Sequence, residues 1–230
     1  MYKFYIANKN YSSWSLRPWI LMRELRIPFE EHLIHFGSET EWAAYRQIAQ
    51  SGKVPSLCDG ETVVWDSLSI VEYLNEHHDG VWPGNPQARA WARSAAAEMH
   101  SGFTELRMRC TMNCGVRVCL RNMAPGLQQD LGRIETLWDD GLQRFGGPFL
   151  AGDTFSAVDA CFAPVAFRIQ TYSLALAPAS AAYAERLLSL PSMQQWYADA
   201  LRETFRDATH EPEVVNVGDI LLQDLRASCA

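Results

Sequence analysis

The chain has 230 residues, of which 48% are hydrophobic and 20% are charged, as in a globular protein with a sizeable core. Acidic residues outnumber lysine and arginine by 27 to 20, so the formal net charge at pH 7 is −7. An acidic chain lacks the basic face that nucleic-acid binding requires, and we expect no nucleic-acid partner. No hydrophobic run approaches the ~20 residues of a membrane span, and the N-terminus does not resemble a signal peptide. These features predict a cytoplasmic protein with no membrane partner.

Residues 1–80 alternate between strand-like and helix-like patterns. "YKFYIA" predicts a strand, and apolar residues at helical spacing follow it until "IPF" ends the helix. Later segments predict a half-buried strand, a helix, a hairpin around Gly60 and a last helix, over 29–36, 38–49, 54–65 and 66–78. This order predicts an α/β domain with a small mixed sheet over residues 1–80.

A segment dense in glycine and proline, Asp79–Gln87, predicts a domain boundary. Beyond it the patterns are helical, over residues 88–109, 125–145, 154–169 and 192–205, and no strand is expected. Ser156 and Asp159 have the spacing of a capping box, which predicts a structural role at the start of a buried helix. We therefore expect an all-helical second domain over residues 87–230.

The chain has six cysteines, three of them in "CTMNCGVRVC" as Cys110, Cys114 and Cys119. Their spacing lacks the paired C-x-x-C motifs of a zinc site, and no histidine lies close downstream. In a cytoplasmic protein we expect reduced thiols that pack as small apolar side chains, with no metal.

Two serines, Ser12 and Ser13, lie between the first predicted strand and the first predicted helix. A hydroxyl at this position is favoured as an N-cap, because it accepts a hydrogen bond from a free backbone N–H. A helix N-terminus also carries about half a positive charge and stabilises anions, including thiolates. Two roles remain open for these serines: capping the helix, or donating a hydrogen bond to a bound thiolate.

The segment "KVPSL" places Val54 before Pro55 at the start of a strand. A proline restricts the residue before it to an extended conformation. A cis bond here would expose the backbone of Val54 for pairing with an extended peptide. The alternative is a trans proline that opens an edge strand, since only ~5–6% of such bonds are cis.

Asp66 and Ser67 begin the last helix of the α/β domain, and Ser69 with Glu72 has the spacing of a capping box. Helix capping is one interpretation. In the other, Asp66 binds the ammonium of an amino-acid group, while the hydroxyl and backbone N–H of Ser67 bind its carboxylate.

The order and spacing of these motifs resemble those of the cytosolic glutathione S-transferases over nearly the whole chain. "SSWSLRPWILMREL" is similar to the serine-containing first-helix motif of the zeta, theta and delta classes. "KVPSL" is similar to the cis-proline loop of the family, "DSLSIVEYL" to its Glu/Asp-Ser motif, and "SAVDACFAP" to its capping box. The resemblance implies a thioredoxin-like N-terminal domain followed by a helical-bundle C-terminal domain, with glutathione as co-substrate.

The resemblance assigns Ser12 to the glutathione sulfur, with Ser13 as the alternative because adjacent serines leave the register open by one residue. Trp14 stands where the zeta motif usually has cysteine, and this first-helix turn has no cysteine. That departure argues against mixed-disulfide chemistry and leaves the zeta-class isomerase activity as an alternative.

The same resemblance implies the remaining glutathione contacts. Lys53 would bind the glycyl carboxylate, and Val54, held by Pro55, would pair its backbone with the cysteinyl unit. Asp66 and Ser67 would hold the γ-glutamyl end.

The segments 107–113 and 167–172 are expected to line an electrophile pocket, with Met108, Met112 and Tyr172 as candidates. The expected function is a transferase that activates the glutathione thiol for attack on a small electrophile. The alternatives are a glutathione-dependent cis–trans isomerase and a non-catalytic glutathione- or ligand-binding module. The resemblance also implies a homodimer.

Overall fold

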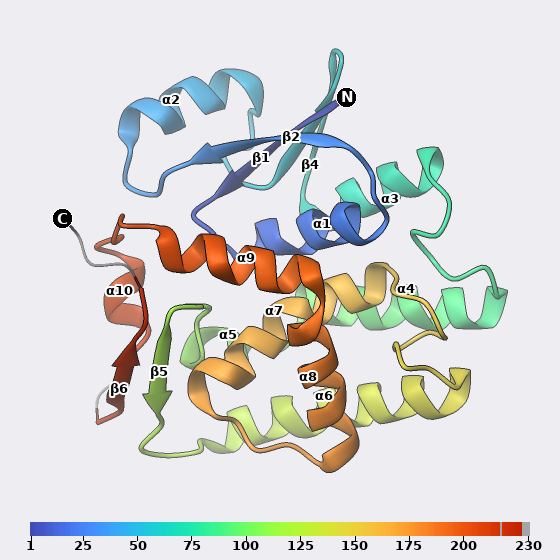
Figure 1. Ribbon diagram of the computed structural model, residues 1–230, viewed down its shortest axis with the longest axis vertical. Coiled ribbons are helices and arrows are strands. Elements are labelled where there is room, and N and C mark those ends of the chain that lie inside the picture. Colours follow the sequence, from blue (N-terminus) through green and yellow to red (C-terminus); the bar gives the residue numbers. More distant parts are fainter. Residues whose placement is uncertain (217, 227–230) are drawn as a thin grey trace.

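The computed structural model describes residues 1–216 and 218–226. Its first part is the predicted α/β unit, which contains β1 (Tyr2–Ala7), α1 (Ser13–Glu24), β2 (Phe29–Ile34), α2 (Glu39–Ile48), β3 (Ser56–Asp59), β4 (Thr62–Trp65) and α3 (Ser67–His77). The sheet order is β2-β1-β3-β4, with β1 parallel to β2 and the other neighbours antiparallel. Helices α1 and α3 lie on the side of the sheet that faces the rest of the molecule, and α2 lies on the other (Figure 1). The thioredoxin-like arrangement is confirmed.

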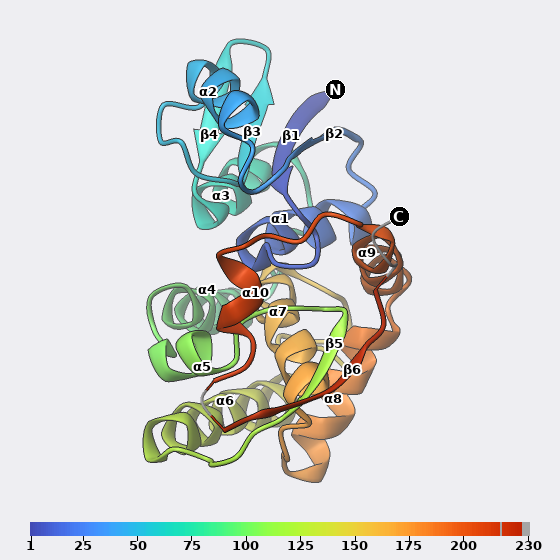
Figure 2. The same cartoon turned by 90° about the vertical axis from the view of Figure 1, so that its left-hand side faces the viewer.

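The hairpin between β3 and β4 forms where the sequence predicts it. Gly60 has φ +58° in the turn, a left-handed conformation that glycine adopts without a steric penalty. Beside it Asp59 pairs with Thr62. The hairpin brings the loop before β3 and the start of α3 to the same edge of the α/β unit, where both face the helical part (Figure 2).

The second part is mainly helical, as predicted, and contains α4 (Pro86–Ser101), α5 (Thr104–Arg109), α6 (Pro125–Phe145), α7 (Ala157–Tyr172), α8 (Pro178–Ser189), α9 (Pro191–Arg202) and α10 (His210–Glu213). The single helix expected over residues 88–109 is two helices. Its break falls at Gly102 and Phe103, and Phe103 has φ +58°. The break turns α5 away from the axis of α4 and so aims its side chains in a new direction. Helix α8 was not predicted.

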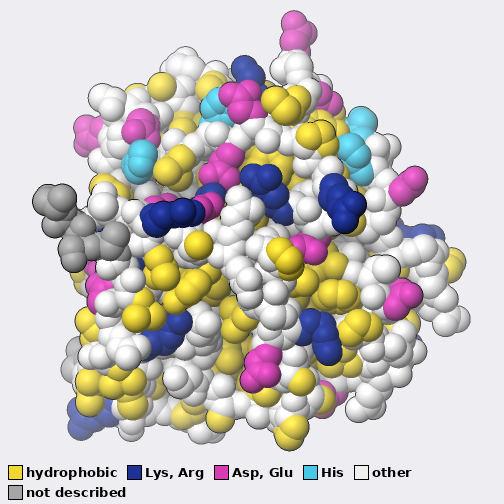
Figure 3. Space-filling model, in the orientation of Figure 1, with side chains coloured by type: hydrophobic (Ala, Val, Ile, Leu, Met, Phe, Trp, Pro, Cys, Tyr) yellow, Lys and Arg dark blue, Asp and Glu magenta, His cyan; other side chains and the backbone are white. Residues whose placement is uncertain are grey.

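Two short strands, β5 (Val116–Cys119) and β6 (Ile220–Asp224), form an antiparallel pair in the second part, so the expectation of no strand there is wrong. Each has at most five residues, and they lie about a hundred residues apart in the chain, so neither pattern stands out in the sequence alone. Hydrophobic side chains gather over this region at the lower left of Figure 3, where all of β6 is exposed. Elsewhere on that face acidic and basic groups are interspersed.

Helix α7 is the centre of the helical part, with nearly every residue buried. The predicted capping box at its start is confirmed: a carboxylate oxygen of Asp159 accepts the backbone N–H of Ser156 at 2.9 Å. The other carboxylate oxygen accepts the backbone N–H of Leu150 and the hydroxyl of Tyr183. Burial nevertheless raises the pKa of Asp159 above its ordinary value.

One hydrophobic core runs through both parts, from β1 and α1 into α4 and α7. The loop after β1 is held to α9 by Lys9, whose buried ammonium lies 2.8 Å from carboxylate oxygens of both Glu31 and Asp199. The backbone carbonyl of Lys9 also accepts the indole N–H of Trp196 at 2.9 Å. The two parts are thus joined directly before the serines at the start of α1.

Among the described helices, none is long and apolar enough to cross a membrane.

Candidate functional site

A cleft between the α/β part and the helical part consists of two adjoining hollows of about 420 and 450 Å³, the size range of small-molecule sites. Both are lined by Trp14, Lys53 and Val54. The first hollow extends toward α5, α7 and α10. The second extends toward the start of α3 and the start of β3. In Figure 2 the start of α1 lies at this junction, beside α10. The cleft is therefore long enough for an extended tripeptide with a second compound at one end.

Ser12 and Ser13 both line the first hollow. Ser12 occupies the N-cap position of α1, but its side chain makes no capping bond; its hydroxyl oxygen lies 2.7 Å from that of Ser15. Ser13 is the first residue of the helix, so the idea that it serves as the cap is wrong. Both serines thus line the hollow at the start of a helix, a position that suits an anionic sulfur.

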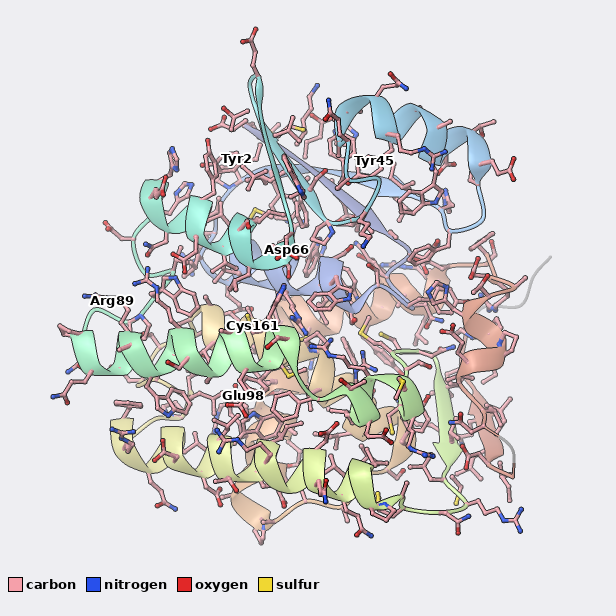
Figure 4. The ribbon with its side chains drawn as sticks, turned by 180° about the vertical axis from the view of Figure 1, so that it is seen from behind. Tyr2, Tyr45, Asp66, Arg89, Glu98 and Cys161 are labelled. Carbon is pink, nitrogen blue, oxygen red and sulfur yellow. The ribbon has the colours of Figure 1, made fainter. Side chains whose placement is uncertain are left out.

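The loop before β3 carries Lys53, Val54 and Pro55, which all line the second hollow. The Val54–Pro55 bond is cis, as the resemblance implies. The hydroxyl of Tyr45, labelled on α2 in Figure 4, donates to the carbonyl of Lys53 at 2.8 Å and contacts Ser56 Oγ at 2.9 Å. This buried tyrosine fixes the loop against the sheet.

Asp66 and Ser67 line the second hollow at the start of α3. Asp66 caps the helix as expected, since its carboxylate accepts the backbone N–H of Leu68 at 2.8 Å. It is exposed, has φ +70°, and lies at the edge of the α/β part that faces α4 (Figure 4). From α4, His100 Nε2 approaches the other carboxylate oxygen to 3.5 Å, and burial lowers the pKa of this histidine. Asp66 thus keeps an oxygen directed toward the cleft while it caps the helix.

The capping box suggested by Ser69 and Glu72 does not form. Glu72 instead accepts hydrogen bonds from the side chains of Trp82 and Arg93. Because Asp66 already supplies the cap of α3, Ser69 lies inside the helix.

Of the three candidates for the electrophile end, only Met112 lines the first hollow. The side chain of Met108 is 57% exposed, on the outer face of α5. Tyr172 is buried, and its hydroxyl donates to the carbonyl of Val214 at 3.1 Å. The segments 107–113 and 167–172 do reach the hollow: the first contributes Arg107 and Thr111 besides Met112, and the second contributes Arg168.

The sequence reasoning missed several residues of the cleft: Tyr11, Trp14, Phe36, Trp42, Arg107, Thr111, Arg168, His210 and Glu213 line the first hollow, and His100 lines the second. His210 and Glu213 belong to α10, which packs beside the first helix through a stack of His210 on Tyr11. The only local signal was the run of aromatic and serine residues at 11–15, which identifies one wall of the cleft and not the other.

Tyr11 is not a free hydroxyl donor for a ligand. Its hydroxyl donates to Glu211, and burial together with this bond raises its pKa to about 12. The group therefore stays protonated and engaged near neutral pH, which leaves the serines as the hydroxyl donors at the start of α1.

The cysteines are not arranged as a metal site in the described residues, which contain no cluster of three or more metal-binding side chains. Cys110 and Cys114 are buried, while Cys119 is exposed. Burial raises the pKa of Cys110 to about 12, so this thiol stays protonated near neutral pH.

Comparison with known proteins agrees with this geometry. Residues 11–77 match the description "Glutathione S-transferase, N-terminal domain", and residues 117–199 match "Glutathione S-transferase, C-terminal domain". The chain belongs to the glutathione S-transferase family. Both halves are matched in the order expected, so the family resemblance drawn from the motifs is confirmed.

Other proteins are similar to this chain in sequence or in structure. A probable maleylacetoacetate isomerase of Vibrio cholerae is 25% identical over 80% of this chain and 90% of its own length. The dichloromethane dehalogenase of Methylorubrum extorquens is 41% identical, but only over 26% of this chain and 21% of its own. A glutathione transferase homologue from Burkholderia, solved with bound glutathione, has a TM-score of 0.67 at 21% identity and covers 86% of this chain and 97% of its own. The last likeness establishes a shared fold.

Proposed function

We propose that this glutathione S-transferase family member binds glutathione along the cleft, ionises its thiol at the start of α1, and transfers the thiolate to a small electrophile. The observation that carries the proposal is the alignment of three element starts along one cleft: Ser12 and Ser13, the Lys53–Pro55 loop, and Asp66 with Ser67. In this pose the sulfur lies near Ser12 and the γ-glutamyl group near Asp66.

The charged and polar groups along the cleft match glutathione both in their charges and in their order along the tripeptide. The ammonium of the γ-glutamyl group meets the exposed carboxylate of Asp66, and its carboxylate meets the N-terminus of α3 at Ser67. Lys53 is exposed and supplies a cation for the glycyl carboxylate. The backbone of Val54 lies between these two ends and is available for the cysteinyl unit.

Thiol activation requires little free energy. Glutathione's thiol begins near the ~8.5 of free cysteine, and lowering its pKa by about two units corresponds to ~2.7 kcal/mol. A charge-assisted hydrogen bond contributes ~1.5–3 kcal/mol and a helix end ~0.3–1 kcal/mol. Ser12 and the start of α1 are sufficient, and the cleft then supplies proximity.

Two measurements test the proposal together: retention of the protein on immobilised glutathione, and turnover of glutathione with 1-chloro-2,4-dinitrobenzene. In that reaction the carbon–sulfur bond forms, the carbon–chlorine bond breaks, and chloride leaves with the bonding pair. Retention with no turnover of any electrophile would support a non-catalytic binding module instead. No retention and no turnover would reject glutathione as the co-substrate.

A second candidate is glutathione-dependent cis–trans isomerisation, because several relatives that align over most of the chain are named probable maleylacetoacetate isomerases. Isomerisation of maleylacetone faster than conjugation of the aromatic chloride would favour it. We also propose a cytoplasmic homodimer, which rests on the family alone and is tested by sedimentation equilibrium and by cell fractionation.

A further inference from the structure

Three arginine side chains meet at the electrophile end of the cleft, and they come from three helices. Arg107 of α5 and Arg168 of α7 line the first hollow, and Arg17 of α1 lies behind Trp14. The guanidinium groups of Arg17 and Arg107 lie 4.1 and 4.7 Å from the centre of the Trp14 ring. The family proposal assigns no role to this group, which we call the arginine cluster.

The arginine cluster is buried without its usual partners. Arg168 is 4% exposed; its Nη1 donates to the carbonyl of Cys110, and its Nε has no hydrogen-bond partner in the part of the chain that the structure describes. None of the three guanidinium nitrogens of Arg17, which is 1% exposed, has a partner within those residues either. Buried charges are ordinarily paired, because an unpaired one is costly. Arg168, which lines the cleft, therefore points to an anion that completes its pairing.

Electrostatics around Arg168 agree with this. Burial, followed by repulsion from Arg107, lowers its pKa to about 10. Tyr172, Cys110 and Cys114 act in the opposite direction and raise the pKa of Arg168. Burial raises the pKa of each of these three groups above its ordinary value. These three groups are neutral near pH 7, so they do not offset the charge of Arg168.

Glu213 is the carboxylate that lines the same hollow, and it does not neutralise the cluster. Its side chain is exposed on α10, where water screens it. Arg107 donates hydrogen bonds to the carbonyls of Gly102 and Met99, and these acceptors carry no net charge. Asp130 acts in favour of Arg107, whereas the groups that act in favour of Arg168 are neutral, so it is chiefly the charge of Arg168 that is left to a ligand.

The walls of the hollow define the rest of the ligand. The rings of Phe36 and Trp42 are stacked, with centroids 6.0 Å apart and planes 21° apart, and Met112 adds an apolar surface. Flat apolar walls with cations at one end suit a planar molecule that has a negative group at its edge.

We propose that the second substrate is a flat electrophile that carries a carboxylate, and that Arg168 and Arg107 bind this carboxylate. The proposal rests on the proposed function, because it names the substrate class for the same cleft. A bound carboxylate pairs the orphaned guanidinium of Arg168 and places the reacting carbon beside the sulfur at Ser12.

A matched pair of probes tests the charge alone: 4-chloro-3,5-dinitrobenzoate and 4-chloro-3,5-dinitrobenzamide. In both, the thiolate attacks the carbon that bears chlorine, the carbon–sulfur bond forms, and chloride leaves with the bonding pair; the thiol proton goes to solvent. Rates are divided by the uncatalysed rate to remove intrinsic reactivity. We expect the benzoate to be favoured in kcat/KM about ten- to a hundredfold, as one or two charge-assisted hydrogen bonds imply.

Binding is measured separately by calorimetry, with the protein saturated in S-methylglutathione, which cannot react and which occupies Lys53. The wild-type protein should bind the benzoate at least about tenfold more tightly than the benzamide. Arg168→Gln should remove this difference, and Arg168→Lys should restore part of it. Arg109→Gln is the matched control, because Arg109 lies on the same helix as Arg107, is exposed and pairs with Glu105.

The two proposals fail in different ways. Equal binding of benzoate and benzamide by a protein that binds S-methylglutathione overturns the carboxylate site and leaves glutathione binding intact. A benzoate preference that survives Arg168→Gln but disappears in Lys53→Gln also overturns it. If S-methylglutathione does not bind, the proposed function fails, and the benzoate preference of wild type over Arg168→Gln still decides the arginine site.

Discussion

The hydroxyl oxygen of Ser12 lies 2.7 Å from that of Ser15, and Ser15 in turn accepts the backbone N–H of Ala7 at 3.3 Å. Either hydroxyl can be the donor of this pair, and in one arrangement the Ser15 oxygen accepts from Ala7 while its proton is given to Ser12. The Ser12 proton is then free for a third group. A short chain of hydrogen bonds thus links the end of β1 through Ser15 to Ser12, which lines the cleft.

The first prediction concerns this chain. Ser12→Ala should raise the thiol pKa of bound glutathione by about one to two units, since a charge-assisted hydrogen bond contributes ~1.5–3 kcal/mol and one unit equals ~1.4 kcal/mol. Ultraviolet titration of the thiolate in the complex measures this. Ser13→Ala is the matched control and should leave the pKa unchanged. The opposite pattern would transfer the role to Ser13.

The second prediction separates the two roles of Asp66. Asp66→Asn keeps a good N-cap and a residue that tolerates positive φ, but it loses the charge that meets the ammonium. The KM for glutathione should rise about tenfold, with the free energy of unfolding unchanged within ~0.5 kcal/mol. Asp66→Ala should in addition destabilise the fold by about 0.5–2 kcal/mol. An unchanged KM in Asp66→Asn would remove Asp66 from the glutathione site.

The third prediction concerns Lys9. Lys9→Met leaves the carboxylates of Glu31 and Asp199 without their shared cation. Because both carboxylates are partly solvated, we expect a loss of about 2–4 kcal/mol, less than for a fully buried pair. Urea unfolding measures it, and Lys3→Met, an exposed change on β1, is the control. A loss no larger than that of the control would show that the ammonium does not hold the two parts together.

The fourth prediction concerns the effect of acidic pH on strand β6, near the end of the described chain. Hydrogen bonds from Arg226 hold the pKa of Asp224 below its ordinary value of 3.8. At Glu211 burial acts upward, but bonds from Arg226 and Tyr11 outweigh it and keep the pKa below 4.5. Groups with lowered native pKa values stabilise fully above their ordinary values, and this contribution disappears as the pH falls through the native ones.

Hydrogen-exchange protection of the β6 amides should therefore be higher at about pH 6 than in acid, and it should fall as the pH drops below the ordinary value of 3.8 of Asp224. Arg226→Gln should lower the protection at about pH 6 and reduce its change with pH. Arg144→Gln, an exposed change on α6, should have no effect. Protection that does not change with pH in the wild-type protein would contradict the role given to these ion pairs.

Periodicity predicted the α/β unit well, because each of its strands and helices has a local pattern and a marked end. Helices or strands begin or end at Pro28, Gly60 and Asp66. At these positions local backbone geometry, not distant packing, decides the structure. Strands β5 and β6 could not be predicted in this way, since each is defined by a partner about a hundred residues away.

The residues proposed to bind glutathione lie in local sequence motifs and could be predicted from them. The arginine cluster could not, because it is assembled from distant parts of the chain. Arginine in a helix is ordinarily read as solvent-facing. Although Arg168 falls in a helix that the sequence predicts to be buried, its position on the buried side of that helix is not indicated. The burial of Arg17 and Arg168 follows from the packing of α1 against α7. Arg107 of α5 meets Arg17 at the ring of Trp14. Met108 shows the converse: a hydrophobic residue in the right segment is placed on the outer face by the break before α5.

The attachment of Lys9 to α9 also determines which parts of the molecule can move. It anchors the polypeptide just before Ser12, so the two halves cannot separate like a hinge at the place where the sulfur would sit. The first hollow is bordered by α2 and α10, which contribute the half-buried Trp42 and, from α10, His210 and Glu213 to its walls. The kinetics of ligand entry should then depend on these peripheral helices more than on the anchored segment before Ser12.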